Sequence, residues 1–232
     1  MWDDPVKNYA LVLAIVVGTA ISAHFGFQLS QAGTLFTPPY VAFAATIIFA
    51  CYAAARAYFD GDLRSLLRIR AGDLSRGFLG VLLLFGLAYG FNRLAMTPGT
   101  ARESWMARLY LQFGHPFMLR NQQPQIAAAL LVAAISEELV WRGLVPRLLE
   151  QRFGTSRAWV VAAVLYAVAL VPTAWALRDP VAGLNPVLPL GGLVAGLTWG
   201  WMAQRFGRLF PSVLSHFAFC WAVIIVFPLW GV

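Results

Sequence analysis

The chain has 232 residues, of which 60% are hydrophobic and 12% are charged, and its mean hydropathy is +0.69. This composition excludes an ordinary soluble globular domain and is typical of a polytopic membrane protein. The net charge of +7 comes from 16 Arg and one Lys distributed among short loops, a placement that indicates membrane topology and predicts no nucleic-acid partner.

Seven stretches approach the ~20 apolar residues that cross the hydrocarbon core of a bilayer. They predict an all-α, polytopic transmembrane helical bundle of about seven spans with short interfacial helices, in a single integral membrane domain over residues 1–232. The expected spans are 9–28, 40–58, 78–97, 125–146, 158–177, 188–204 and 211–230. The first span is expected to be retained, because Asp3 and Asp4 precede it and no cleavage signature follows a short apolar core.

The distribution of basic residues predicts the orientation of the bundle. With the N-terminus in the cytoplasm, eleven basic residues fall in cytoplasmic segments and four in outer loops. The eleven are Lys7, Arg56, Arg64, Arg68, Arg70, Arg76, Arg147, Arg152, Arg157, Arg205 and Arg208, and the four are Arg102, Arg108, Arg120 and Arg178. This bias predicts a cytoplasmic N-terminus. The Arg-rich, nearly Lys-free composition suggests a bacterium with a GC-rich genome, and hence the inner membrane.

Two connecting segments are candidates for the membrane surface, which makes the lipid bilayer an expected partner. Residues 60–76 alternate leucines with arginines, a pattern that fits either a short helix beside anionic lipid or a solvated loop. Residues 101–113 predict a helix on the outer surface, which ends where Gly114, His115 and Pro116 interrupt it.

The sixth span carries Gly192, Gly196 and Gly200 at a spacing of four, which puts a glycine ridge on one face. The ridge fits internal packing and dimerisation equally, so the sequence defines no oligomeric state. Cys51 and Cys220 both fall inside spans, and a structural disulfide between them is not expected.

The run from Ser136 to Arg142 sets charged side chains inside the fourth span. Each ionisable group at mid-bilayer costs about 2.5 to 3.5 kcal/mol on insertion scales, so a functional reason is expected. Glu138 and Arg142 lie one turn apart and are expected to pair, which leaves Glu137 as the free carboxylate that a general base requires. A structural ion-pair network and the proton relay of a transporter would use the same residue types.

Histidines in other spans bear on this choice. At ~1.5 Å per residue, His216 lies about 8 Å and Glu137 about 15 Å from the cytoplasmic edge, so both are expected to open to one cytoplasm-facing cavity. His24 is expected to form an interhelical hydrogen bond, and His115 is expected in a turn.

Other chemistries are not supported. Glu137, Glu138 and His216 do not make up a typical zinc ligand set, and the chain contains no H-E-x-x-H and no G-x-S-x-G motif. Nucleotide-binding glycine loops are also absent from the sequence. No cofactor and no metal ion are therefore predicted.

Taken together, these residues resemble the CPBP family of intramembrane endopeptidases, which includes CAAX prenyl proteases and bacteriocin-processing or immunity proteins. The resemblance rests on Glu137-Glu138-x-x-x-Arg142 on one span, the glycine-rich stretch from Gly192, the basic turn from Arg205 to Arg208, and the entry from Pro211 to His216. It covers about residues 124–224, which are expected to form the family-like catalytic core.

The resemblance implies a glutamic-type protease in which Glu137 activates water, Glu138 and Arg142 orient it, and His216 lies on the oxyanion side. Two positions depart from the family pattern. The F-x-x-x-H element falls on Tyr166 to Leu170, so leucine stands where the family has a water-activating histidine. Cys220 stands at the oxyanion position where asparagine is usual, and a thiol is only a weak donor.

The leading hypothesis is an intramembrane glutamic endopeptidase that hydrolyses a peptide bond of a membrane-anchored protein near its terminal segment, from the cytoplasmic half of the bilayer. Some bacterial relatives are linked to C-terminal sorting tags, which consist of a terminal span followed by a basic cluster. A protein with such a tag is the more specific substrate that this resemblance suggests. The alternative is a catalytically silent binding or immunity scaffold, motivated by Leu170 and Cys220.

Overall fold

The structure is a computed structural model, and it describes residues 4–29, 37–113 and 121–229. Within these residues the chain is built from helices, and the one β-type pairing is an isolated bridge between Asp179 and Gly183. The helices are α1 (Pro5–Leu29), α2 (Thr37–Phe59), α3 (Leu63–Leu66), α4 (Asp73–Ala95), α5 (Glu103–Leu111), α7 (Gln123–Glu138), η2 (Leu139–Leu144), α8 (Val145–Phe153), α9 (Thr155–Ala176), α10 (Val187–Phe206), α11 (Phe210–Trp221) and η3 (Ala222–Val226). The prediction of an all-α membrane bundle is confirmed.

Four helices, α1, α2, α4 and α9, are long and apolar enough to cross a membrane. They correspond to the first, second, third and fifth of the expected spans. The other three expected spans are the continuous run α7–η2–α8, the 20-residue helix α10, and the apolar run Phe210–Val226 formed by α11 and η3. Polar groups or short length distinguish these three helices from the other four, and two of them carry the acidic run and His216.

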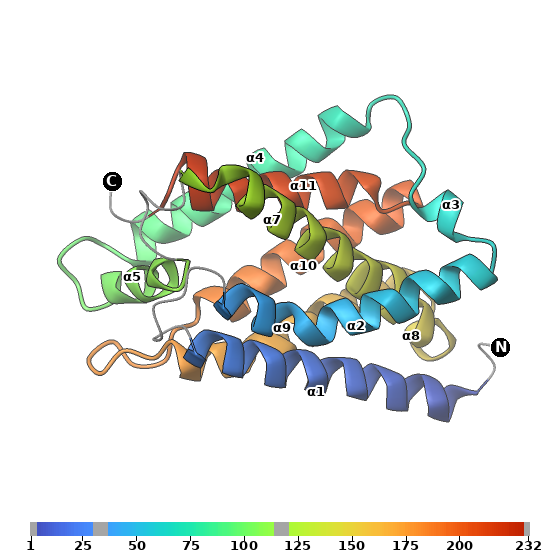
Figure 1. Cartoon of the computed structure of the whole chain (residues 1–232), viewed down its shortest axis with the longest axis horizontal. Helices are drawn as coiled ribbons and strands as arrows, with labels where there is room; N and C mark the ends of the chain where they lie inside the picture. The colour runs from blue at the N-terminus through green and yellow to red at the C-terminus, as the bar shows by residue number, and fades with distance from the viewer. Residues whose placement is uncertain (1–3, 30–36, 114–120, 230–232) are drawn as a thin grey trace.

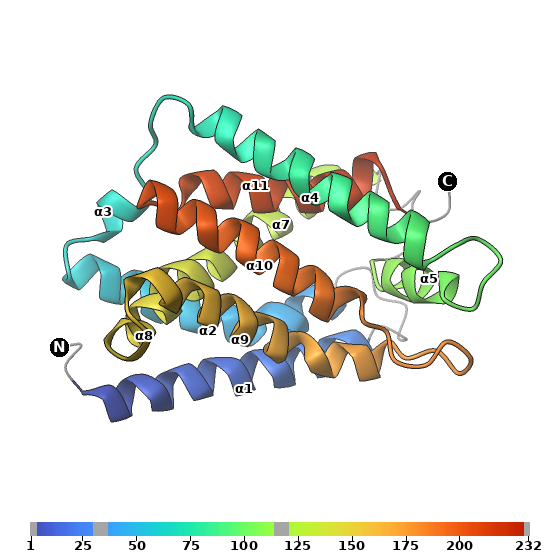
Figure 2. The same ribbon diagram turned by 180° about the vertical axis from the view of Figure 1, so that it is seen from behind.

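The long helices run side by side along the longest axis of the molecule (Figures 1 and 2). α1 packs against α2 and α9, α9 against α10, and α4 against α11. The start of α1, α3 and α8 gather at one end of the bundle, whereas α5 and the α9–α10 connection lie at the other (Figure 1). The run α7–η2–α8 passes between these ends with the acidic residues near its middle.

For the connection between α2 and α4, residues 60–76, the sequence fitted either a short surface helix or a solvated loop. The structure has a single turn, α3, because Gly61 and Gly72 adopt positive φ angles of 78° and 84° and interrupt the helix. α4 then begins at Asp73 and not at residue 78. The Asp73 side chain is fully buried and pairs with Arg208, so this polar residue belongs to the packed helix.

The outer helix is close to the expectation over 101–113, because α5 covers Glu103–Leu111. Its Met106 and Leu109 are buried with Met96 and Leu177, so α5 is packed against the end of the bundle. The expected turn at Gly114, His115 and Pro116 lies outside the described residues.

The glycine ridge of α10 faces α9 within the chain. A Cβ atom at Gly192 would lie 2.5 Å from Leu170 Cδ1, one at Gly196 would lie 3.2 Å from Ala163 Cβ, and one at Gly200 would lie 3.1 Å from Trp159 Cε3. The absence of side chains therefore permits the close approach of the two helices, which is the internal packing that the spacing indicated.

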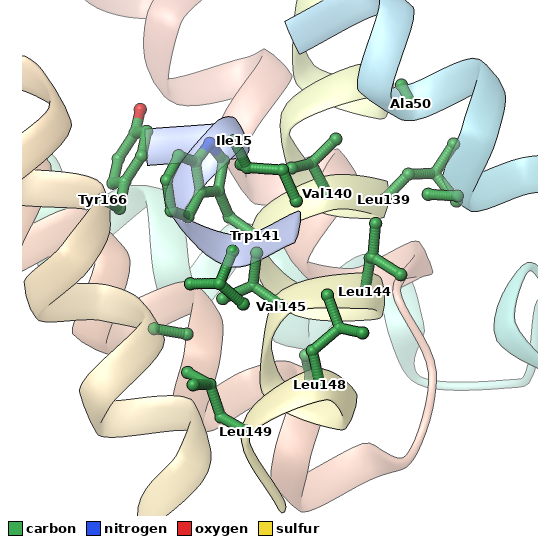
Figure 3. Close-up of a cluster of buried hydrophobic side chains, with 14 of the residues drawn as sticks. Ile15, Ala50, Leu139, Val140, Trp141, Leu144, Val145, Leu148, Leu149 and Tyr166 are labelled. Atoms are coloured by element: carbon green, nitrogen blue, oxygen red, sulfur yellow. The ribbon is translucent and has the colours of Figure 1, made fainter. Parts of the chain in front are cut away.

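The largest apolar cluster surrounds η2 and the start of α8 (Figure 3). Val140, Trp141 and Val145 are almost fully buried among residues of α1, α2 and α9. Because lipid is as apolar as these side chains, close packing rather than hydrophobic burial stabilises such a cluster in a membrane. The cluster fixes the segment that immediately follows the two glutamates.

Candidate active site

The two acidic residues lie where α7 passes into the π-helix η2. Glu137 is 5% exposed and Glu138 is fully buried, and Arg142 lies within η2 itself. A π-helical turn is wider than an α-helical turn and is common at functional sites. Here it joins the glutamates and the arginine in one buried segment.

Glu138 is paired on two sides. Its Oε1 atom lies 3.2 Å from Nη1 of Arg142 and 3.0 Å from Nδ1 of His216. An ionised carboxylate can only accept hydrogen bonds, so the Nδ1–H of His216 donates to Glu138. The expected pair of Glu138 and Arg142 is present, and His216 contacts the same oxygen of Glu138.

Arg142 is held between two aromatic rings. Its guanidinium carbon lies 4.9 Å from the ring centre of Tyr166 and 5.1 Å from that of Trp199. Cation–π contacts of this kind become stronger when the cation is removed from water. The stacking fixes the arginine that partners Glu138.

His216 is fixed by its neighbours on α10 and α7. Its ring stacks on Trp199 with centres 3.8 Å apart and an angle of 13° between the planes. Its Nδ1 faces Glu138, while Nε2 lies 3.7 Å from Oε2 of Glu137. The last distance exceeds a hydrogen bond, but one oxygen atom of water or substrate can contact both groups.

Glu137 has a partner that sequence reasoning missed. The Tyr166 hydroxyl on α9 donates a 2.6 Å hydrogen bond to Oε2 of Glu137. Tyr166 occupies the aromatic position of the expected F-x-x-x-H element, and a buried tyrosine usually finds a partner for its hydroxyl. The tyrosine in place of phenylalanine was the available signal.

The two positions that depart from the family pattern flank this cluster. Leu170 lies one turn after Tyr166 and packs toward Gly192 on α10. Cys220 lies one turn after His216, is half-buried, and its thiol interacts with the His216 ring. Cys51 and Cys220 are free thiols.

An ion pair at the α3 end holds α11 in place. Both carboxylate oxygens of the buried Asp73 on α4 accept hydrogen bonds from Arg208 in the α10–α11 turn, and Arg76 contacts the same carboxylate at 3.2 Å. The backbone N–H of Leu209 also donates to the carbonyl of Leu66 in α3 at 2.8 Å. These contacts fix the start of the helix that carries His216, and sequence reasoning missed them.

The remaining histidine expectations concern positions away from the site. Nδ1 of His24 on α1 lies 3.4 Å from the carbonyl oxygen of Pro172 on α9, which is the expected interhelical contact. His115 lies outside the described residues. In the part of the chain that the structure describes, no three His, Cys, Asp or Glu side chains are grouped as metal ligands.

Comparison with known proteins relates this cluster to a family. Residues 120–222 match the family model described as Rce1-like, type II CAAX prenyl endopeptidase, and this segment contains Glu137, Glu138, Arg142, Tyr166 and His216. No curated protein and no solved structure matches the chain. A buried cluster of two glutamates, an arginine and a histidine inside a helical membrane bundle is compatible with that match. The segment 120–222 is therefore similar to the type II CAAX prenyl endopeptidases, which are intramembrane proteases.

Proposed function

We propose that this chain is an intramembrane protease of the glutamic type and that Glu137 is the general base for the attacking water. The observation that carries the proposal is the short distance between Glu137 and His216: Oε2 of Glu137 lies 3.7 Å from Nε2 of His216. Glu138 is paired with both Arg142 and His216, so Glu137 is the acidic residue that remains for proton transfer. We also propose that residues 1–232 form one integral membrane domain with its catalytic core over 124–224.

In the proposed reaction, Glu137 accepts a proton from water while the water oxygen bonds to the carbonyl carbon of the scissile peptide. The carbonyl oxygen becomes an oxyanion, and His216, which is protonated on both ring nitrogens in this scheme, donates the stabilising hydrogen bond from Nε2–H. The proton then passes from Glu137 to the leaving nitrogen as the C–N bond breaks. A positioned general base of this kind contributes about 10²- to 10⁴-fold to the rate.

Glu138 and Arg142 act through His216 in this scheme. The Glu138 carboxylate holds Nδ1–H, which directs Nε2 toward the Glu137 side of the ring. Arg142 in turn balances the buried charge of Glu138. Cys220 lies on the oxyanion side near His216 and supplies at most a weak donor.

The substrate is proposed to be a membrane-anchored protein that is cut near its terminal segment. The family implies a membrane-embedded peptide, and the expected orientation presents the site to the cytoplasmic half of the bilayer. A bacterial inner-membrane location favours a protein with a C-terminal sorting tag, that is, a terminal span followed by a basic cluster. Deletion of the protease is then expected to leave such a protein unprocessed, and normal maturation of every tagged protein would exclude this substrate class.

A silent scaffold is the second candidate, and Leu170 and Cys220 favour it. Leu170 has no hydrogen-bonding group where active relatives are expected to have a histidine, and Cys220 offers only a weak donor where they are expected to have an asparagine. A scaffold would retain its cellular phenotype when Glu137 is replaced, provided that the protein still accumulates.

The deciding experiment compares the termini of membrane proteins by mass spectrometry in host cells that carry wild-type protein or Glu137→Gln at matched levels. Glu150→Gln is the control, because Glu150 is an exposed glutamate on α8 in the same segment. A terminus present with wild type and Glu150→Gln but absent with Glu137→Gln supports the glutamic mechanism and identifies the substrate. Wild-type processing by Glu137→Gln would exclude Glu137 as the base.

A further inference from the structure

We propose that Tyr166 is the residue that positions Glu137 for proton transfer, an inference that rests on the glutamic mechanism proposed above. The hydroxyl of Tyr166 donates to Oε2 of Glu137 at 2.6 Å, and both side chains are more than nine-tenths buried. Among the described residues, Tyr166 is the one whose side chain donates a hydrogen bond to this carboxylate. Hydrogen bonds to a charged acceptor are short and strong, which matches this distance.

The hydrogen bond fixes the orientation of the Glu137 carboxylate. Oε2 accepts the hydrogen bond of the phenol and faces Nε2 of His216. A carboxylate oxygen can accept a second hydrogen bond, so Glu137 can still take a proton from a water between the two groups. A phenol keeps its proton under conditions in which a carboxylate is ionised, so Tyr166 donates without competing for that proton. Its role is therefore to orient the base.

The Tyr166 ring is held on several sides, so its hydroxyl has a fixed position. Trp141 on η2 has its ring centre 5.2 Å from the ring centre of Tyr166, and the two rings lie beside each other in Figure 3. The Arg142 guanidinium lies 4.9 Å from the ring centre. On the α10 side Gly192 lies next to the ring, because a Cβ atom built there would be 3.5 Å from Cε1 of Tyr166. This preorganisation means that no rearrangement is needed at the moment of reaction.

Leu170 explains why the tyrosine has this role in this chain. Leu170 lies one turn further along α9, packs toward the same glycine of α10, and has no hydrogen-bonding group in its side chain. The hydroxyl of Tyr166 is thus the polar group that α9 contributes beside Glu137. Tyr166 lies one turn before Leu170, the position at which the family pattern has a histidine.

The test uses the full-length protein in lipid nanodiscs and the precursor found by the terminus comparison. In Tyr166→Phe the ring and its packing remain, so the protein is expected to accumulate. Loss of a hydrogen bond to a charged group predicts a kcat about ten- to hundredfold lower. KM is expected to stay unchanged, because Tyr166 does not contact the substrate in this proposal. Tyr58→Phe is the control, since Tyr58 is an exposed tyrosine on α2.

Two further measurements separate positioning from packing. The infrared carboxylate band that disappears in Glu137→Gln is expected to shift in Tyr166→Phe, and this readout requires no substrate. Replacement of Tyr166 by 3-fluorotyrosine and 3,5-difluorotyrosine keeps the ring and the hydroxyl but makes the phenol a stronger donor. Under the proposal kcat changes steadily along this series, whereas a packing role predicts the same kcat for every member.

The outcomes distinguish this inference from the mechanism on which it rests. If Glu137→Gln is inactive while Tyr166→Phe and the fluorotyrosine series all keep the wild-type kcat, the role of Tyr166 is wrong and the glutamic mechanism stands. If Glu137→Gln cleaves at the wild-type rate, the mechanism itself fails. If Tyr166→Phe does not accumulate, the fluorotyrosine series decides alone.

Discussion

At the residue scale, the two adjacent glutamates have different partners, which supports the different roles proposed for them. Glu138 is fully buried between Arg142 and His216, whereas Glu137 contacts Tyr166 and the far nitrogen of the histidine. Removing one member of a buried ion pair leaves an uncompensated charge, which costs about 3 to 5 kcal/mol. The Glu138–Arg142 pair should consequently govern stability as well as the orientation of His216.

Arg142→Met tests this division. The variant leaves Glu138 buried with one fewer partner, so we expect a lower melting temperature in detergent and a lower level in the membrane fraction. The double variant Glu138→Met/Arg142→Met removes both charges and is expected to recover much of the level without recovering cleavage, because His216 loses its Nδ1 partner. A wild-type melting temperature for Arg142→Met would show that the pair does not stabilise the bundle.

Sequence reasoning predicted four residues of this cluster because charged groups stand out in an apolar span. Glu137, Glu138, Arg142 and His216 are brought together as expected. Tyr166 was missed, although it donates to Glu137. An aromatic side chain in a membrane helix fits ordinary packing equally well, and its partner lies 29 residues away in the chain. Only the three-dimensional arrangement reveals that its hydroxyl faces the carboxylate.

At the element scale, the structure depends on close helix contacts that the sequence indicates and on helix ends that it does not. Spacing alone predicted the α10 glycine ridge, because small residues four apart share one face. The early start of α4 at Asp73 could not be predicted, since the ion pair that buries this residue joins positions 135 residues apart. The π-helix η2 has no recognisable signal in its sequence either.

The ridge yields a prediction with a matched control on the same helix. In Gly196→Ala the new Cβ would lie 3.2 Å from Ala163 Cβ and 3.4 Å from the Ala163 carbonyl oxygen, so α9 and α10 must move apart. In Gly191→Ala nothing lies within 4 Å, and the alanine gains helix propensity of up to about 1 kcal/mol. We expect Gly196→Ala to lower the melting temperature and Gly191→Ala to keep or raise it. Equal melting temperatures would mean that the ridge does not set the helix spacing.

At the scale of the whole molecule, the two ends of the bundle differ in charge and in construction. The end with α3, α8 and the start of α1 carries the Arg147–Asp62, Arg56–Asp60 and Arg208–Asp73 ion pairs (Figures 1 and 2). The opposite end carries α5 and the Asp179 turn, which Arg108 contacts at 3.0 Å. The greater number of arginines at the α3 and α8 end supports the proposal that this end faces the cytoplasm. The two glutamates lie near the middle of the segment α7–η2–α8. The orientation of the bundle in the membrane therefore decides from which side a substrate reaches them.

Cysteine labelling tests this orientation. Val181, at the α9–α10 end, is 83% exposed, and Ile69, beside α3, is 64% exposed, so both accept a reporter cysteine after Cys51 and Cys220 are replaced by serine. With the N-terminus in the cytoplasm, Val181→Cys should react with a membrane-impermeant maleimide in spheroplasts. Ile69→Cys should react only in inverted membrane vesicles, because the arginine-rich end then faces the cytoplasm and is exposed to the reagent only after inversion. The reverse pattern would turn the Glu137 site toward the outer side, and a substrate cut from the cytoplasmic half of the bilayer would then be excluded.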